Sequence, residues 1–310
     1  MNNPSKVIEH VAIIGGSGFV GRHLAHRLHT DGHRVTVLTR QAPANLSIEQ
    51  TPIRGVQVDS QSTAALTEAL SGITTLVNLA GILHQGGQQS FNAVHAELPA
   101  RLVQACTTAG VARYLHMSAL RADMNQPPSA YLRSKACGEM MAREASQQLA
   151  VIIFRPSIIF GEGDNFFGQF AKMLRWMPVF PLVCPNARFA PVWVDNVAGA
   201  FSVVINQPAQ PGLREAYNLC GPRSYSFREL IRFTAGALGL PRLIVGLPNW
   251  MAQLQGRVLQ HLPGPLFTLD NYYSLQSDSV CECNDLERLD IKPAALEAIM
   301  TSLLARRRSG

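Results

Sequence analysis

A cluster of glycines near the N-terminus constrains the fold of this chain more than any other feature. The glycines have G-x-x-G-x-x-G spacing in Gly15-Gly16-Ser17-Gly18-Phe19-Val20-Gly21, directly after the apolar run 11–14. The helical pattern of Leu24 and Leu28 follows, so strand, turn and helix are predicted in that order. Glycine lets the backbone turn sharply and approach a phosphate, and a helix N-terminus offers free N–H groups to it. The segment predicts a dinucleotide-binding turn; the alternative is a tight turn that needs glycine for geometry alone.

Short apolar runs continue to alternate with helical patterns up to about residue 155. The runs lie at 11–14, 35–38, 56–58, 76–79, 114–117 and 151–154. The gaps between them are long enough for crossover helices. This rhythm predicts an α/β fold, a doubly wound parallel sheet of the Rossmann type with helices on both faces. The hydrophobic share of 47% in 310 residues indicates a sizeable core and excludes a disordered or collagen-like chain.

The rhythm ends after Pro156, and a second part of the chain is predicted there. Phe160-Gly161-Glu162-Gly163-Asp164-Asn165 has the composition of a loop. Residues 1–157 are therefore predicted as the Rossmann domain. Residues 158–310 are predicted mainly as a smaller C-terminal substrate lobe, with about 195–220 returning to the first domain. In this second part we expect helices at 195–206, 226–238, 248–261 and 294–306, and a strand at 216–219.

Charge and cysteine content restrict the partners and the compartment. The 27 basic and 21 acidic residues give a formal net charge of +6, but the only basic run is Arg306-Arg307-Arg308, so no nucleic-acid partner is predicted. The first ten residues lack a secretory signal pattern, and a cytoplasmic location is expected. The six cysteines are accordingly interpreted as buried thiols rather than a disulfide framework. Cys281-Glu282-Cys283 has the wrong spacing for zinc, and no metal site is predicted.

Two residues at strand ends bear on the choice of cofactor. The second predicted strand ends in Thr39-Arg40, where an acid would grip the ribose hydroxyls of NAD. An arginine there can bond a 2′-phosphate, which favours NADP(H) over NAD(H); the alternative is a solvated arginine. Asp59, after the third predicted strand, either accepts a bond from the adenine amino group or caps the helix that follows.

Several motifs together resemble one family. The glycine turn, Asn78-Leu79-Ala80-Gly81, Met117-Ser118 and Tyr131-x-x-x-Lys135 resemble the extended short-chain dehydrogenase/reductases, the NAD-dependent epimerase/dehydratases. Softer details, including Arg155-Pro156-Ser157, Val194-Asp195-Asn196-Val197-Ala198 and Leu262-Pro263-Gly264-Pro265, are most similar to an atypical branch. That branch contains the NADPH-binding accessory subunit of mitochondrial complex I and bacterial relatives described as nucleoside-diphosphate-sugar epimerases.

The resemblance implies roles for individual residues. Tyr131 would be the acid/base for hydride transfer, Lys135 would hold the nicotinamide ribose, and Ser118 would bond the substrate oxygen. Tyr131 and Lys135 are spaced i, i+4 and share a helix face, so we expect the ammonium to lower the tyrosine pKa. Asp195 would be a structural acid that bridges the lobes. The residues that would contact the cofactor are Gly15, Ser17, Gly18, Phe19, Val20, Gly21, Arg40, Asp59, Leu79, Ala80, Gly81, Lys135 and Pro156.

Two features depart from the family pattern. Only twelve residues separate Ser118 from Tyr131, where typical members have a longer substrate loop. His95 stands where the family usually has an asparagine that relays protons. His95 either replaces that asparagine or is a packed histidine.

The sequence of the second part of the chain does not indicate a particular substrate. Arg188, Arg223 and Arg228 could meet a diphosphate, although scattered arginines are usually solvated. Trp250 begins an apolar segment that packs on the core, on a partner or on a membrane surface, and core packing is favoured. With the C-terminal arginines, Trp250 would form a peripheral anchor on the inner membrane.

Two functions are therefore predicted for the chain. The first is an NADP-dependent oxidoreductase or epimerase that acts through Tyr131 on a small, nucleotide-linked or quinone-like substrate. The alternative is a non-catalytic accessory or assembly protein that holds NADPH.

Overall fold

A computed structural model describes residues 8–41, 46–48, 51–86, 89–145, 147–259 and 267–306. Its centre is a sheet of seven parallel strands, and β3 joins one edge antiparallel. The α/β fold predicted from the apolar runs is thus confirmed. In spatial order the strands are β12 (Arg214–Leu219), β7 (Ala150–Pro156), β6 (Arg113–Met117), β5 (Thr75–Asn78), β1 (His10–Ile14), β2 (Arg34–Thr39), β4 (Thr51–Gln57) and β3 (Leu46–Ile48).

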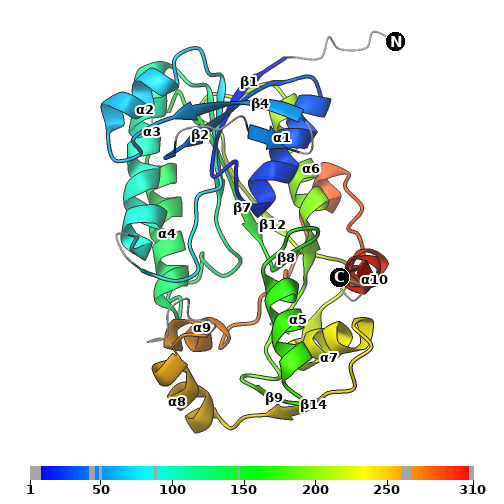
Figure 1. Cartoon of the computed structure of the whole chain (residues 1–310). Coiled ribbons are helices and arrows are strands. Elements are labelled where there is room, and N and C mark those ends of the chain that lie inside the picture. The colour runs from blue at the N-terminus through cyan, green and yellow to red at the C-terminus, as the bar shows by residue number, and fades with distance from the viewer. Residues whose placement is uncertain are drawn as a thin grey trace.

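Helices cover both faces of this sheet (Figure 1). One face carries α1 (Phe19–Thr30) and α6 (Val194–Asn206), and the other carries α2 (Thr63–Ala69), α3 (Leu98–Ala109) and α4 (Ala130–Arg143). A short π-helix, η1 (Ala93–Glu97), runs directly into α3.

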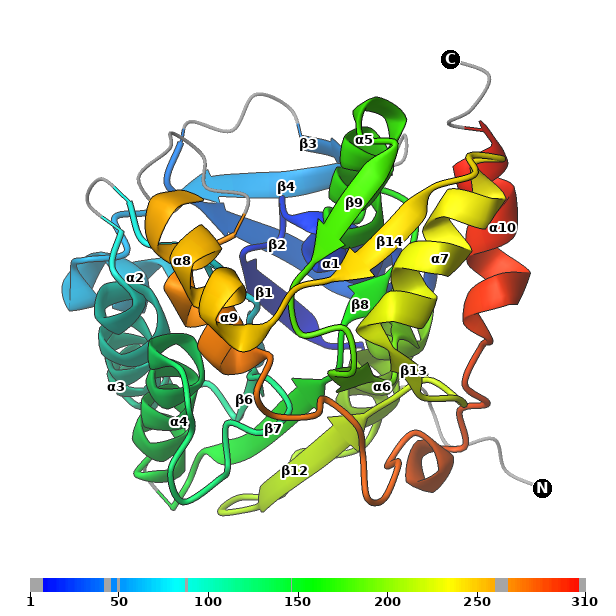
Figure 2. The same cartoon turned by 90° about the horizontal axis from the view of Figure 1, so that it is seen from below.

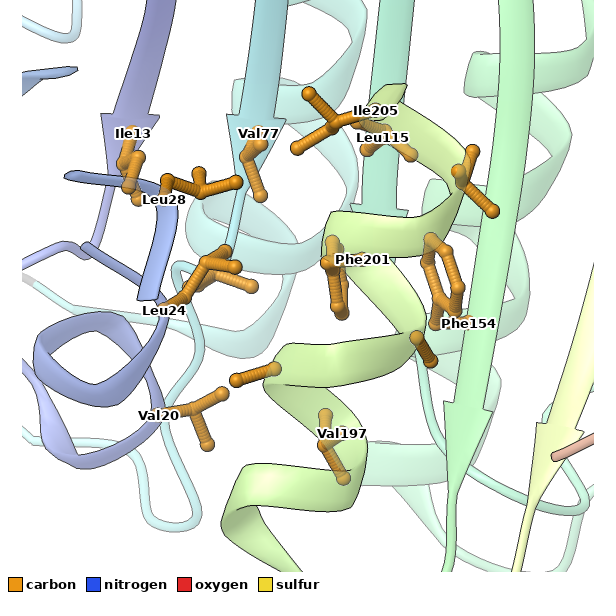
Figure 3. Packing of buried hydrophobic residues seen from close by; sticks show 14 of the residues in the cluster. Ile13, Val20, Leu24, Leu28, Val77, Leu115, Phe154, Val197, Phe201 and Ile205 are labelled. Atoms are coloured by element: carbon orange, nitrogen blue, oxygen red, sulfur yellow. The ribbon is translucent and has the colours of Figure 1, made fainter. Parts of the chain in front are cut away.

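The two faces of the sheet have separate cores because side chains alternate along each strand. In β1, Ile13 belongs to the core under α1 and α6, whereas Ala12 belongs to the core under α2 and α3. Figure 3 shows the first of these cores, in which Phe201 of α6 faces Phe154 of β7. Their rings stack with centroids 3.9 Å apart. Both faces are buried, so the strands have continuous apolar runs.

The elements after β7 form most of a third core, built around Phe160, Phe167, Leu174, Phe180 and Leu230. We call the elements around this core the C-terminal lobe. They include three two-stranded pairs, β8 with β11, β9 with β14, and β10 with β13. The carboxyl ends of the central strands point toward this lobe (Figure 1). Its strands are β8 (Ile159–Phe160), β9 (Val179–Leu182), β10 (Arg188–Phe189), β11 (Val192–Trp193), β13 (Tyr225–Ser226) and β14 (Leu243–Gly246). Its helices are α5 (Phe166–Trp176), α7 (Phe227–Ala237), α8 (Asn249–Leu259), α9 (Leu269–Ser274), the 3₁₀-helix η2 (Glu287–Leu289) and α10 (Leu296–Arg306).

After β7 the sequence pattern predicted four helices and one strand, and it missed two helices and the short strands of the C-terminal lobe. The helices expected at 195–206, 226–238 and 294–306 correspond to α6, α7 and α10, and the strand expected at 216–219 lies in β12. The helix expected at 248–261 corresponds to α8. Residues 260–261 of that expected range lie outside the described part. Helices α5 and α9 were not predicted. Glycine and several phenylalanines lower the helix propensity of α5, and burial of its apolar face overrides that preference.

Two expectations about side chains are corrected. Cys220 and Cys281 form a disulfide, although 61 positions separate them in the sequence, so the expectation of buried free thiols is wrong for this pair. It is also wrong for Cys137 and Cys283, which are exposed, and correct for Cys106. Trp250 is 67% exposed, so it is not a core residue.

Some expectations fall on residues outside the described part. These are Leu262-Pro263-Gly264-Pro265, Arg307 and Arg308, and of Arg306 only the backbone is described. Among the described helices, none combines the length and apolar character that a membrane span requires.

Candidate active site

The glycine turn between β1 and α1 needs at least two of its glycines for steric reasons. Gly15 has φ +79°, and a Cβ there would lie 2.9 Å from the carbonyl carbon of Leu79. A Cβ on Gly21 would lie 2.3 Å from the carbonyl oxygen of Gly15. Side chains at either position would push α1 and the 79–81 segment away from the turn. These glycines therefore hold the first turn of α1 close to the carboxyl edge of the sheet.

The N-terminus of α1 is open in the manner that a phosphate requires. Gly18 is the N-cap, no described side chain caps the helix, and its first turn has no acidic residue. Ser17 and Gly18 are exposed, while Val20 points into the core. Uncapped N–H groups at the positive end of a helix dipole favour an anion. The turn therefore fits a dinucleotide pyrophosphate, contacted by backbone groups rather than by the side chain of Val20.

Arg40 and Asp59 lie at the carboxyl ends of adjacent strands, and both are exposed. The side-chain amide of Gln89 faces Arg40. With its oxygen toward the guanidinium, the amide accepts hydrogen bonds from Arg40, one of them from Nη2 at 2.8 Å. Asp59 accepts a bond from the Gln61 N–H at 2.9 Å, and Ser62 is the residue that caps α2. Asp59 thus shapes the turn before the helix and is not its N-cap.

The 79–81 segment connects the glycine turn to Lys135. The Leu79 N–H donates to the carbonyl of Ile14 at 2.9 Å, and the Ala80 N–H donates to Asn78 Oδ1 at 3.1 Å. A Cβ on Gly81 would lie 3.5 Å from Lys135 Nζ. Leu79, Ala80 and Gly81 therefore lie between the predicted phosphate turn and the predicted catalytic helix.

Ser118 and Lys135 meet at the end of β6. Lys135 Nζ donates to the carbonyl oxygen of Met117 at 2.9 Å. The next residue, Ser118, donates its backbone N–H to Phe154 at 2.8 Å, which extends the pairing with β7 toward the buried Pro156. The Ser118 hydroxyl is buried and has no hydrogen-bond partner among the described residues. A buried hydroxyl without a partner is costly, so this oxygen fits a ligand group.

Burial sets the pKa values of the Tyr131 and Lys135 side chains. It raises the pKa of Tyr131 to about 12 and lowers the pKa of Lys135 to about 8, although Glu139 partly opposes the second shift. The expected lowering of the tyrosine pKa by Lys135 is therefore wrong for the protein alone. The lysine ammonium is bound to the Met117 carbonyl, and the loss of hydration outweighs any attraction between the two side chains.

His95 is a packed histidine and not a free proton relay in this structure. Its Nε2 lies 3.0 Å from the Ile82 N–H, and its Nδ1 lies 2.8 Å from Ser134 Oγ. Because Nε2 accepts a bond from a backbone donor, Nδ1 carries the proton. Burial, with a smaller effect of Lys135, lowers the pKa of His95 to about 3. The ring also meets Tyr131 edge-on, with centroids 5.5 Å apart, so His95 positions the tyrosine and the loop after β5.

The start of α4 is held by residues that the sequence did not single out. Ser129 is the N-cap, and its Oγ accepts a bond from the Leu132 N–H at 3.1 Å. The Asp270 carboxylate, from α9, accepts bonds from the backbone N–H groups of Ala130 at 2.6 Å and Tyr131 at 3.1 Å. Ser129 was readable as a helix cap, but Asp270 is 140 residues away from its partner, so no local signal could identify it.

A buried ion pair fixes α4 against β7. Arg155 donates to both carboxylate oxygens of Glu139, with Nε at 2.8 Å, and its Nη1 donates to Asp123 at 2.7 Å. Such bidentate pairs are geometrically specific. Arg155, which the sequence analysis noted only as part of a family motif, therefore sets the position of the helix that carries Tyr131.

Three arginines of the C-terminal lobe were considered for a diphosphate, and two of them contact other residues. Arg188 donates to Ser224 at 2.6 Å, and Arg223 lies 3.7 Å from Glu297. Arg228 begins α7. Asp195 lies 2.9 Å from His23 Nδ1 of α1, and this contact ties α6 to α1.

The comparisons with known proteins agree with this geometry. Residues 11–220 match the model of the NAD dependent epimerase/dehydratase family. The mitochondrial NADH dehydrogenase (ubiquinone) 1 alpha subcomplex subunit 9 of Rattus norvegicus is 27% identical over 307 residues, covering 96% of this chain and 80% of the rat protein. The ceramide reductase of Caulobacter vibrioides is 29% identical over 240 residues, covering 77% of this chain and 74% of that protein.

A solved structure extends the similarity to the whole fold. The dTDP-glucose 4,6-dehydratase DesIV from Streptomyces venezuelae, solved with NAD and TYD bound, has a TM-score of 0.75 at 20% identity and covers 97% of each chain. The family match covers well over half of this chain, including the glycine turn and the Tyr131/Lys135 helix. The chain belongs to the NAD-dependent epimerase/dehydratase family.

Proposed function

We propose that this protein is an NADP(H)-binding oxidoreductase or epimerase that uses Tyr131 as its acid/base. The observation that carries the proposal is the convergence of four features at the carboxyl edge of the sheet. They are the uncapped start of α1, the 79–81 segment, the buried Lys135 ammonium and the unpartnered Ser118 hydroxyl. Ligands of parallel α/β folds bind at this edge.

Each residue has a defined task in this proposal. The backbone of residues 15–21 and the N-terminus of α1 hold the pyrophosphate, and Arg40 exchanges its contact with Gln89 for a 2′-phosphate. A bound nicotinamide cofactor supplies or accepts the hydride. In the reducing direction Tyr131 Oη donates a proton to the carbonyl oxygen of the substrate. The carbonyl carbon receives the hydride. Ser118 donates a hydrogen bond to the same oxygen, and Lys135 bonds the nicotinamide ribose.

The high pKa of Tyr131 in the protein alone suits a proton donor. A phenol whose pKa is about 12 stays protonated at neutral pH. In the oxidising direction the tyrosine must lose this proton. The positive charge of a bound oxidised nicotinamide would then stabilise the phenolate. We therefore expect ordered binding, in which the dinucleotide binds before the substrate.

A second candidate function is an accessory protein that holds the dinucleotide without turnover. It is favoured by the similarity to the complex I subunit, which covers 96% of this chain. The packed His95 also supports it, because neither ring nitrogen is free to relay a proton. This candidate needs the glycine turn and Lys135 but not the phenol of Tyr131.

Complementation of a deletion strain distinguishes the two functions without knowledge of the substrate. Tyr131→Phe keeps the ring but removes the proton, and loss of an acid/base costs ~100- to 10,000-fold in rate. We expect Tyr131→Phe to bind NADPH normally and to fail in complementation. The matched control is Tyr273→Phe, at an exposed tyrosine of α9, and it should complement fully. Full rescue by Tyr131→Phe would show that the accessory function is correct.

A further inference from the structure

One end of the C-terminal lobe carries an exposed apolar surface. On α8 it consists of Trp250, Met251, Leu254 and Val258, and on the neighbouring β9–β14 pair it consists of Val179, Leu243 and Val245, with Trp176 at the end of α5. All eight side chains are at least 38% exposed. We call this surface the docking face. Figure 2 looks at the molecule from this end, with α8, β9 and β14 toward the viewer.

The docking face follows from the regular periodicity of its elements. Trp250, Leu254 and Val258 are spaced i, i+4, i+8 on one side of α8. The opposite side carries the buried residues Ala252 and Gly256, and a Cβ on Gly256 would lie 3.1 Å from the Leu269 Cα of α9. The helix is thus amphipathic in an unusual sense, because its small residues face the protein and its large apolar residues face outward.

The strand pair repeats the same arrangement. Leu243 and Val245 of β14 are exposed while Ile244 between them is buried, and Leu243 is the register partner of Val179 in β9. Leu243 and Val179 therefore lie side by side on the outer face of the pair. Residues 247–248 join β14 directly to α8, so the two apolar faces are consecutive along the chain.

The two segments that carry this surface have charged residues of one sign. Residues 166–182 and 240–259 contain four basic residues and no aspartate or glutamate. Lys172, Arg175 and Arg257 are exposed, and Arg242 is held by a 2.6 Å bond from Nε to the carbonyl of Leu174. Exposed tryptophan and aliphatic side chains together with exposed basic side chains match the interface of an anionic bilayer, where apolar side chains insert and cations meet the headgroups.

We propose that the docking face binds the surface of an anionic phospholipid bilayer. The cations that serve it are those of α5, β14 and α8. Figures 1 and 2 place the described end of α10 away from α8, on the other side of α7. The proposal keeps Trp250 from the anchor expected with the C-terminal arginines and adds the described elements around it.

The docking face is connected to the candidate active site through α9. Helix α8 packs on α9, whose Asp270 accepts the backbone N–H bonds of Ala130 and Tyr131, and whose Ser274 donates to Ser129 at 2.8 Å. Bilayer contact at α8 therefore holds the first turn of α4 near the membrane surface. Resting on the proposed function, this arrangement would present Tyr131 to a substrate that resides in the bilayer.

Vesicle flotation with the full-length protein tests the proposal. The probes are phosphatidylcholine vesicles with and without 30% phosphatidylglycerol, at 50 and 500 mM salt. The wild type is expected to float with the anionic vesicles at low salt and to bind at least 10-fold less to neutral vesicles or at high salt. Leu254→Glu should reduce flotation at least 10-fold, and Arg257→Gln should reduce it severalfold.

Met140→Glu is the matched control, because Met140 is 50% exposed on α4 and lies outside the docking face. It should float like the wild type. NADPH binding and thermal unfolding of each variant confirm that it is folded, and they are independent of the membrane result. The proposal is overturned if the folded wild type stays with the supernatant at low salt. It is also overturned if Met140→Glu and Leu254→Glu lose binding equally, or if Leu254→Glu instead dissociates a dimer that forms without vesicles.

Discussion

At the scale of single residues, Lys135 is a buried charge of the candidate site. It is 4% exposed, and its ammonium is bound to one backbone carbonyl. The fall of its pKa from 10.5 to about 8 corresponds to roughly 3 kcal/mol of destabilisation by the buried charge at neutral pH. The unfolded chain binds more protons than the native protein between pH 8 and 10.5, so native stability rises with pH across this window.

Lys135→Met should therefore be more stable than the wild type at pH 7 by roughly 2 to 3 kcal/mol. Most of this difference should disappear by pH 10, because the wild-type lysine is then neutral in the folded protein. Urea unfolding at the two pH values measures it, and NADPH affinity should fall in the same variant. A stability difference that does not change between pH 7 and 10 would contradict the lowered pKa.

Arg40 decides the cofactor in the proposed function. Loss of one charge-assisted bond costs ~1.5 to 3 kcal/mol, so Arg40→Ala should weaken NADPH binding roughly 10- to 100-fold and leave NADH binding almost unchanged. Arg34→Ala is the control, because Arg34 begins β2 and lies at the opposite end of the strand from Arg40. Calorimetry gives both affinities, and equal wild-type affinities for the two cofactors would refute the NADP(H) assignment.

At the scale of elements, the site depends on how closely α4 approaches η1. A Cβ on Gly138 of α4 would lie 2.1 Å from the carbonyl oxygen of His95 in η1 and 3.3 Å from His116 Nε2. The helix axes can come this close only because position 138 has no side chain. The contact keeps His95 against Ser134 and Tyr131, so the packing of two helices sets the geometry of the tyrosine.

Gly138→Ala should destabilise the protein by about 2 to 4 kcal/mol, because the extra methyl group overlaps backbone atoms that cannot move independently. Gly236→Ala is the matched control. Gly236 is an exposed glycine of α7 with nothing within 4 Å of its hypothetical Cβ. Alanine there should stabilise the helix by up to about 1 kcal/mol. Denaturant unfolding of both variants checks the contrast, which fails if the two substitutions have the same sign.

At the scale of the whole molecule, the segment 278–285 connects the loop after Ser118 to both parts of the chain. Arg121, in the loop after Ser118, donates to the carbonyls of Asp278 at 2.8 Å and Val280 at 3.3 Å. The Ser157 hydroxyl donates to the carbonyl of Ser279 at 2.6 Å. The Cys220–Cys281 disulfide then attaches this segment to the end of β12.

Reduction of this disulfide should lower stability by about 2 to 4 kcal/mol, because it releases a loop of 61 positions in the unfolded chain. Cys281→Ser should have the lower stability and no response to reductant, while Cys283→Ser should respond like the wild type. Thiol titration of the unreduced, denatured protein checks the starting point. Four free thiols are expected, and six would show that the disulfide does not form.

Local sequence patterns determined the layout of the sheet and the phosphate turn. The apolar runs located six of the seven parallel strands because both faces of the sheet are buried, and such strands are recognisable without knowledge of their neighbours. The glycine spacing located the turn, since Gly21 lies against the backbone of Gly15 and Gly16 in the same turn. Tyr131 and Lys135 were found because one helical turn separates them.

The tertiary structure alone decided the features that depend on distant segments. Asp270 reaches the start of α4 from 140 positions away, and Cys281 reaches Cys220 from 61 positions away. The pKa of Tyr131 rises because the folded chain removes water from the phenol, an effect of burial that the spacing to Lys135 does not encode. Trp250 is exposed because Ala252 packs into the core of the C-terminal lobe and Gly256 fits against α9, which turns the large apolar side chains of α8 outward.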